Sequence, residues 1–118
     1  MRHHKKVKKF HRKRGKRRAF IKNLAQNLVR DEKIETTEIR AKALRSFVER
    51  LITLAKKQTL ASRRLIIARL GNEKLAHKLF DVIAPRYLNR PGGYLKITKL
   101  AKTRKRDSAP MVTLEFVK

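Results

Sequence analysis

The first thirty residues carry charge of one sign only, and this block constrains how the chain can fold. Residues 1–30 contain thirteen Lys and Arg residues and no acid, and the first carboxylate is Asp31. Cations packed this closely repel one another and cannot be neutralised within the segment. We therefore expect residues 1–15 to form an extended basic arm that orders against a polyanion. Nucleic acid is the commonest such partner, because binding to phosphate releases condensed counterions.

The remaining residues, 16–118, are enough for one small α+β domain with its own core. The hydrophobic share of 41% excludes a wholly disordered polycation, although the net charge is +25. The absence of cysteine excludes disulfides, thiolate catalysis and cysteine-based zinc sites. No stretch is apolar enough to span a bilayer, and no apolar segment follows the basic start as in a secretory signal. We expect a cytoplasmic protein.

Apolar residues at helical spacing predict four helices, over residues 16–30, about 38–57, 60–70 and 73–84. Thr36 or Thr37 is placed to cap the second helix, which we expect to be the spine of the core. Thr59 is placed to cap the third helix and Gly71 to close it in a left-handed conformation. The fourth helix is predicted to end at Pro85.

Three short segments alternate apolar and polar residues and predict strands at residues 33–37, 94–100 and 111–117. Residues 101–110 are too many for a tight hairpin turn, so we expect a basic loop between two antiparallel strands. The predicted fold class is therefore α+β, with two layers and the order α-β-α-α-α-β-β. We expect a small mixed sheet with helices on one face, preceded by the basic N-terminal extension.

Basic residues gather in the arm, on the polar side of the first helix, in the hairpin loop, around a Pro-Gly-Gly turn and on the third helix. Basic residues three or four positions apart share a helix face and can dock on a phosphate backbone. Each cluster also has a simpler interpretation, as a solvated charged surface or as protection of a sheet edge. We predict that the nucleic-acid-binding residues are Arg2, His3, Lys5, Lys6, Lys8, Lys9, His11, Arg12, Lys13, Arg14, Lys16, Arg17, Arg18, Lys22, Arg63, Arg64, Arg86, Arg90, Lys96, Lys102, Arg104, Lys105 and Arg106.

Two neighbours of these cations, Tyr87 and Leu88, are predicted to pack in the core, whereas Phe10 could either stack on a base or pack on the first helix. The histidines near the N-terminus match no structural zinc spacing, and the surrounding cations would repel a metal ion. The chain contains no HExxH, P-loop or GxSxG motif. We therefore predict no catalytic residue, no metal, no cofactor and no enzyme activity.

Several segments together resemble a known family. They are RAFIKNLAQNL at 18–28, IETTEIRAKALR at 34–45, PRYLNRPGGY at 85–94 and APMVTLEFV at 109–117. In these segments the chain is similar to the bacterial ribosomal large-subunit protein seventeen family. The resemblance implies a structural protein of the large ribosomal subunit that contacts large-subunit rRNA and neighbouring ribosomal proteins. It implies no membrane and no small-molecule substrate. The alternative that shares the charge pattern is a DNA-compacting architectural protein.

Overall fold

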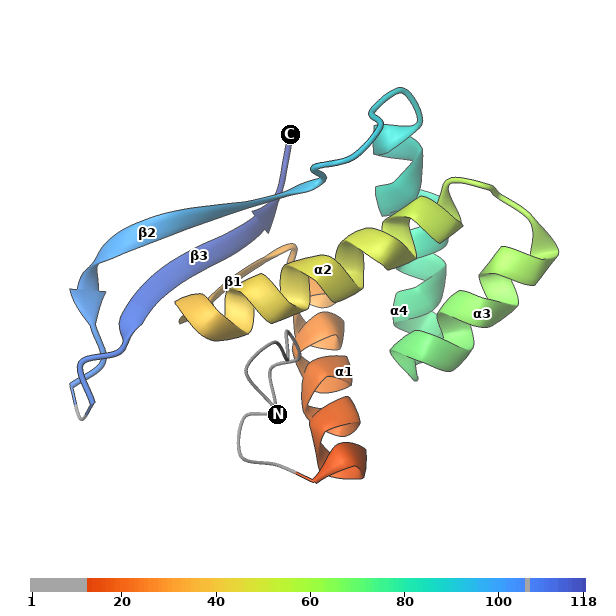
Figure 1. The fold of residues 1–118 in the computed structure, drawn as a ribbon. Coiled ribbons are helices and arrows are strands. Elements are labelled where there is room, and N and C mark those ends of the chain that lie inside the picture. The colour runs from red at the N-terminus through yellow and green to blue at the C-terminus, as the bar shows by residue number, and fades with distance from the viewer. Residues whose placement is uncertain (1–12, 106) are drawn as a thin grey trace, which may run out of the picture.

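A computed structural model describes residues 13–105 and 107–118, and in this part of the chain helices pack on one face of a three-stranded sheet (Figure 1). The predicted α+β class and the predicted element order are confirmed. The elements are α1 (Arg14–Asp31), β1 (Lys33–Thr37), α2 (Glu38–Ala55), α3 (Leu60–Leu70), α4 (Glu73–Lys78), the π-helical turn η1 (Leu79–Ile83), the 3-10 turn η2 (Ala84–Tyr87), β2 (Leu95–Thr103) and β3 (Pro110–Phe116).

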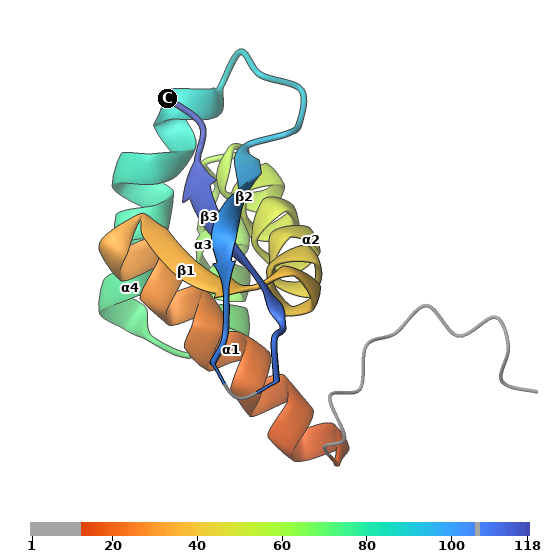
Figure 2. The ribbon, with the colours of Figure 1, turned by 90° about the vertical axis from the view of Figure 1, so that its left-hand side faces the viewer.

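Helix α1 begins earlier than the sequence pattern indicated. The predicted arm ends at Gly15, but this residue lies in the first turn of the helix, which starts at Arg14. One glycine weakens a helix by only about 0.5–1 kcal/mol and does not stop it. The first turns of α1 extend below the rest of the domain in both views (Figures 1 and 2). The predicted arm, except for its last three residues, lies outside the described residues.

Helix α2 is the spine of the core, as predicted. Its buried side chains face α1, α3 and all three strands, and they are Ala41, Leu44, Val48, Leu51, Ile52 and Ala55. Thr37 occupies the N-cap position, but its side chain makes no capping hydrogen bond. Glu38 instead supplies negative charge to the positive end of this helix, and its carboxylate lies 3.2 Å from Lys42 Nζ.

The predicted ends of α3 are confirmed. The Thr59 hydroxyl accepts a hydrogen bond from the Ser62 backbone N–H at 3.1 Å, and Ser62 Oγ accepts one from the Thr59 N–H at 3.2 Å. This reciprocal pair is a capping box, and it satisfies two backbone donors that the helix leaves free. At the other end, Gly71 has a φ of 75° and donates its N–H to the carbonyl of Ile67. Residues close to each end of α3 therefore determine where this helix begins and ends.

The helix that was expected to stop at Pro85 changes its winding before that residue and continues past it. The α-helical hydrogen bonds end at Lys78, a π-helical turn follows, and a 3-10 turn carries the chain through Pro85 to Tyr87. Proline lacks an N–H and its ring clashes with the carbonyl four residues earlier, so regular α-helical winding cannot continue through it. A wider and then a tighter turn keep the chain helical despite the proline.

The 3-10 turn decides which of two predicted core residues is buried. Tyr87 is buried and its hydroxyl donates to the Val117 carbonyl at 2.5 Å, which confirms the prediction for this residue. Leu88 is 54% exposed, so the prediction that it packs in the core is wrong. With about three residues per turn, Ala84 and Tyr87 share the inner side of the turn and Leu88 falls outside it.

The sheet order is β1-β3-β2, and both strand pairs are antiparallel. The expected mixed sheet is therefore wrong. The direction of β1 relative to the distant hairpin depends on the path of the intervening helices, which the local pattern does not encode. Strand β2 also continues three residues further than predicted, to Thr103, with a register irregularity after Lys99, so the loop shortens to residues 104–109.

The two faces of the sheet differ as the alternation predicts. Ile34, Leu114 and Ile97 lie side by side across the three strands and face the helices. Lys96 and Glu115 are neighbours on the outer face, where Lys96 Nζ lies 3.3 Å from Glu115 Oε1. The core therefore occupies the helix side of the sheet, and the other side carries polar and charged residues.

Candidate nucleic-acid interface

A cleft opens where α1, α2 and α3 meet, on the side of the domain that carries the first turns of α1. It has a volume of about 640 Å³. Its lining, which defines the three-helix cleft, consists of Arg17, Arg18, Ile21, Lys22, Phe47, Arg50, Leu51, Ala68 and Arg69. The basic residues predicted to share one face of the first helix therefore do lie together, and they face other helices rather than open solvent alone.

Local packing between α1 and the end of α3 positions one wall of the cleft. The side-chain amide of Gln26 donates to the Leu70 carbonyl at 2.8 Å. The aliphatic chain of Lys22 lies beside Gly71, where a Cβ atom would be 3.6 Å from Lys22 Cδ. A Cβ atom would therefore fit there in ordinary contact, and it is the positive φ of Gly71 that favours glycine at this end of α3. Arg18 and Lys22 are one helical turn apart, so they line the same wall.

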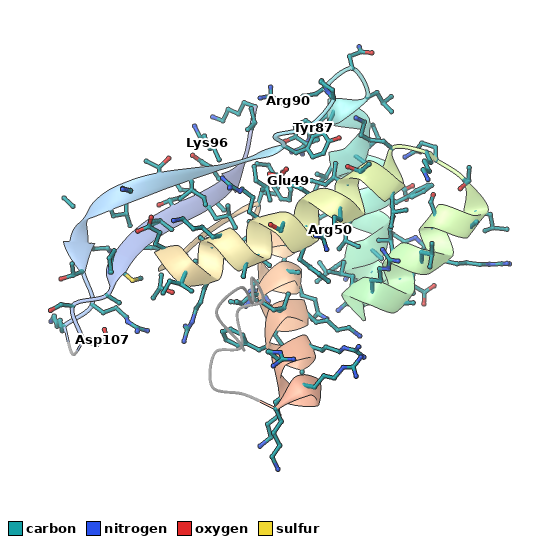
Figure 3. All side chains as sticks on the ribbon, viewed as in Figure 1. Glu49, Arg50, Tyr87, Arg90, Lys96 and Asp107 are labelled. Carbon is teal, nitrogen blue, oxygen red and sulfur yellow. The ribbon has the colours of Figure 1, made fainter. Side chains whose placement is uncertain are left out.

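The cleft has positive charge that no carboxylate of the described residues compensates. Among those residues nine line the cleft, and five of them are Lys or Arg and none is acidic. Among residues 13–105 and 107–118, no carboxylate forms an ion pair with any of these five cations. Glu49 is adjacent to Arg50 in the chain (Figure 3), and both line a pocket beside Tyr94, but no ion pair joins these two described side chains. An anionic ligand in the cleft would therefore meet five cations with which no described carboxylate pairs.

Arg63 makes contacts within the protein. Its guanidinium group contacts His77 Nδ1, with Nη2 at 2.5 Å, and its Nη2 lies 3.8 Å from Asp81 Oδ2. It also lies over the Phe80 ring, 5.3 Å from the centroid. Arg63 thereby ties α3 to the helical segment that follows. The nearby Arg64 is exposed and forms no ion pair within the described part of the chain.

Arg86 and Arg90 line a separate cavity of about 1120 Å³ at one end of the sheet, together with Tyr87 and Phe116. Arg86 Nη1 donates to Glu32 Oε1 at 2.5 Å, and this hydrogen bond lowers the pKa of Glu32 below its ordinary value. Arg90 Nε donates to the carbonyls of the two glycines in the Pro-Gly-Gly turn, at 3.2 Å each. Arg86 therefore has an acidic partner, whereas Arg90 stabilises the turn through backbone oxygens.

Carboxylates pair with some of the cations of the hairpin, which the sequence predicted to be a basic loop. Arg104 pairs with Asp107 across the turn, and its hydrogen bonds lower the pKa of that carboxyl. Lys102 Nζ lies 2.6 Å from Glu35 Oε1 on β1, the other outer strand of the sheet. Lys105 forms no ion pair with a described residue. The tip of the hairpin extends far from the helices on the other side of the domain (Figure 1).

The structure places the remaining predicted residues in two ways. Lys13 lies at the N-cap of α1, and Arg14 and Lys16 lie in the first turn, all of them exposed. The others fall outside the described residues, and they are Arg2, His3, Lys5, Lys6, Lys8, Lys9, His11, Arg12 and Arg106. Their proposed contacts with RNA stay predictions.

Arg50 and Arg69 both line the cleft. The sequence indicated Arg69 only as a weaker candidate, beside Arg63 and Arg64 on the third helix, and it did not indicate Arg50. Arg50 stands on the polar flank of the core helix, between Phe47 and Leu51, and looks like an ordinary solvated cation. A helical wheel places it beside Phe47, but only the packing of α1 and α3 around that flank makes it part of a cleft.

Within the described residues, no group of three His, Asp or Glu side chains is arranged to hold a metal ion. The helices found there are also too short or too polar to cross a lipid bilayer.

Comparison with known proteins gives one consistent result. A family model described as Ribosomal protein L17 matches residues 20–117. Large ribosomal subunit protein bL17 of Persephonella marina is 55% identical, over 99% of this chain and 95% of that protein. The proteins of the same name from Sulfurihydrogenibium sp. and Fusobacterium nucleatum are 50% and 48% identical, again over 99% of this chain.

Proposed function

Because the chain belongs to the ribosomal protein L17 family, we propose that it is a constituent of the bacterial large ribosomal subunit and binds the rRNA of that subunit. Membership confirms the family predicted from the sequence. It also makes the chain a structural component of the ribosome rather than an enzyme. To this premise we add three proposals. They are the surface that binds rRNA, a location of the protein in cytoplasmic ribosomes, and contacts with neighbouring large-subunit proteins.

The unpaired cations of the three-helix cleft carry the proposal. Arg17, Arg18 and Lys22 follow the basic arm directly in the chain, and α2 and α3 add Arg50 and Arg69 on the opposite walls. In the sequence, the basic arm therefore runs directly into the cleft residues of α1, with the exposed first turn of α1 between them. A surface of this kind attracts a polyphosphate at long range and holds it at short range.

The mechanism is charge neutralisation. Each phosphate that meets a Lys or Arg releases counterions, and RNA segments on either side can then approach more closely. Paired RNA hides its base edges in a deep, narrow groove, so phosphate and 2′-hydroxyl contacts dominate. No covalent step is required, in agreement with the structural role of the family.

We propose the residues predicted from the sequence as contacts, with residues 1–15 as the arm and residues 16–118 as the domain, and we add Arg50 and Arg69. The contacts are not expected to be equal. Arg63, Arg86, Lys96, Lys102 and Arg104 each have an acidic partner within 4.0 Å, so a phosphate must compete with that partner. The cations of the cleft have no such competitor in the part of the chain that the structure describes, so they should contribute more per residue.

A competition experiment separates this function from DNA compaction. The full chain is bound to a labelled large-subunit rRNA fragment and displaced by unlabelled rRNA or by duplex DNA at one ionic strength. We expect rRNA to displace the probe at a much lower concentration than DNA does. Equal displacement would favour the DNA-compacting alternative.

Crosslinking in purified large subunits then tests the surface. Ultraviolet crosslinks to rRNA, mapped by mass spectrometry, are expected in residues 1–22 and around Arg50 and Arg69. Crosslinks confined to the outer face of the sheet would contradict the proposed surface.

A further inference from the structure

We propose that the three-helix cleft takes one unpaired nucleotide of RNA, with its base on the apolar floor of the cleft and its phosphates at the basic rim. The inference rests on the proposed RNA-binding function and deepens it. Phosphate neutralisation alone needs only exposed cations, which this chain has over much of its surface. The cleft has a second property that such binding does not use.

That property is an apolar floor with an aromatic side chain. Ile21, Phe47, Leu51 and Ala68 contribute it, and together they join α1, α2 and α3. Leu51 belongs to the buried core, whereas Phe47 is only partly buried and packs against that core from outside. The Phe47 side chain is therefore both held in place and reachable from the cleft.

Unpaired RNA fits this floor and paired RNA does not. In a continuous A-form helix the bases are stacked on one another and cannot reach an apolar surface below a cationic rim. A base in a bulge or loop can leave the stack and lie on an aromatic ring, and every base has the flat face that this contact requires. The cleft volume of about 640 Å³ is within the range of about 300–1,000 Å³ usual for small-ligand sites.

The rim selects an anionic occupant. Arg17, Arg18 and Lys22 stand on one side of the floor, and Arg50 and Arg69 on the others. Because no described carboxylate pairs with these five groups, the cleft has no built-in counterion. A nucleotide supplies a flat apolar face and flanking phosphates at once. An acidic peptide would supply the negative charge, but its acidic side chains have no flat face to stack on the Phe47 ring.

The test uses the full chain and two RNA duplexes that differ by one residue. One duplex is fully paired, and the other carries a single bulged 2-aminopurine, whose fluorescence falls when it stacks. We expect wild type to bind the bulged duplex at least about fivefold more tightly, the lower end of what one base–aromatic stack contributes. Binding should also quench the bulged base. The readout is the ratio of the two affinities. A general loss of charge attraction would weaken binding to both duplexes and would leave this ratio unchanged.

Substitutions identify the ring. Phe47→Leu keeps an apolar side chain and removes the aromatic face, so the bulge preference and the quenching should disappear. Phe80→Leu makes the same change at a buried position outside the cleft and should leave the ratio unchanged. Phe47→Tyr retains a ring and should keep the preference, which preserves the test if Phe47→Leu does not fold.

The outcomes separate this inference from the function on which it rests. Wild type that binds both duplexes equally, without quenching, overturns the nucleotide site and leaves RNA binding intact. Wild type that binds neither duplex nor rRNA fragments overturns the proposed function itself. If a Glu-rich peptide displaces the bulged duplex from wild type but not from Phe47→Leu, the cleft is a protein-docking site and the inference is wrong.

Discussion

The unpaired cations of the cleft should dominate the salt dependence of RNA binding, and one pair of double variants tests this directly. Arg50→Gln with Arg69→Gln removes two exposed cations from the cleft. Lys96→Gln with Lys102→Gln removes two cations that each have a glutamate partner on the sheet. Both variants lower the net charge of +25 by the same amount, so they lose the same long-range attraction.

The expected magnitude comes from counterion release. Each phosphate contact contributes about −0.9 to the slope of log affinity against log salt in duplex DNA, and about −0.7 in single strands. If Arg50 and Arg69 each meet a phosphate, their double variant should show a slope that is shallower by about 1.4–1.8. The variant on the sheet should change the slope less, because each ammonium group already neutralises a carboxylate.

The assay is equilibrium binding of the full chain to one rRNA fragment, measured by fluorescence anisotropy between about 50 mM and about 200 mM salt, where such slopes are well defined. All four substitutions are at exposed positions, so each should change the free energy of unfolding by no more than about 0.5 kcal/mol. Thermal unfolding of both variants checks that the fold is kept. Equal slope changes in the two variants, or none in the cleft variant, would refute the reasoning.

Four further predictions concern the fold. Leu51→Ala, at a core position with 1% exposure, should lower the free energy of unfolding by about 2–5 kcal/mol in urea titrations, and a loss near zero would mean that α2 is peripheral. Gly71→Ala should cost about 1–2 kcal/mol, because its φ of 75° strains any L-residue although the nearest atom to the new Cβ would be 3.5 Å away. Gly15→Ala, in a helix with open space around it, should instead stabilise by about 0.5–1 kcal/mol. The hydrogen bond from Arg86 lowers the pKa of Glu32. The stabilisation that this bond gives the folded protein is therefore complete above the ordinary pKa of 4.5, and it is lost as the pH falls from that value through the lowered pKa. Glu32→Gln should therefore flatten the acid limb of a stability-against-pH curve, and an unchanged limb would show that the Arg86 contact is not made in solution.

Local chemistry made several elements predictable from the sequence. The capping box at Thr59 and the left-handed Gly71 depend only on residues within one helical turn, so the sequence pattern located both ends of α3. The apolar stripe of α2 also followed from spacing alone. The local rules were less complete at Pro85, where a π-helical turn and a 3-10 turn together carry the chain past the proline.

The charged surface was predictable in kind but not in detail. The one-signed block before Asp31 and the positive charge of the remaining chain indicated a polyanion partner from sequence alone. The sequence could not tell which cations are free. Arg63 and Arg104 look as available as Arg18, yet the first contacts His77 and Asp81 and the second pairs with Asp107.

The sequence by itself determined the strong positive charge on which the proposed RNA binding rests, the order of the elements and most of the core, because net charge and hydrophobic periodicity are properties of composition and short spacing. The tertiary structure alone decided that neighbouring strands run antiparallel, that carboxylates pair with Lys96, Lys102 and Arg104, and that Arg50 and Arg69 join Arg17 and Lys22 around an apolar floor. The physical reason is distance along the chain. Ion pairs and clefts form between residues that are tens of positions apart, and only the packing of the helices on the sheet brings those residues within reach of one another.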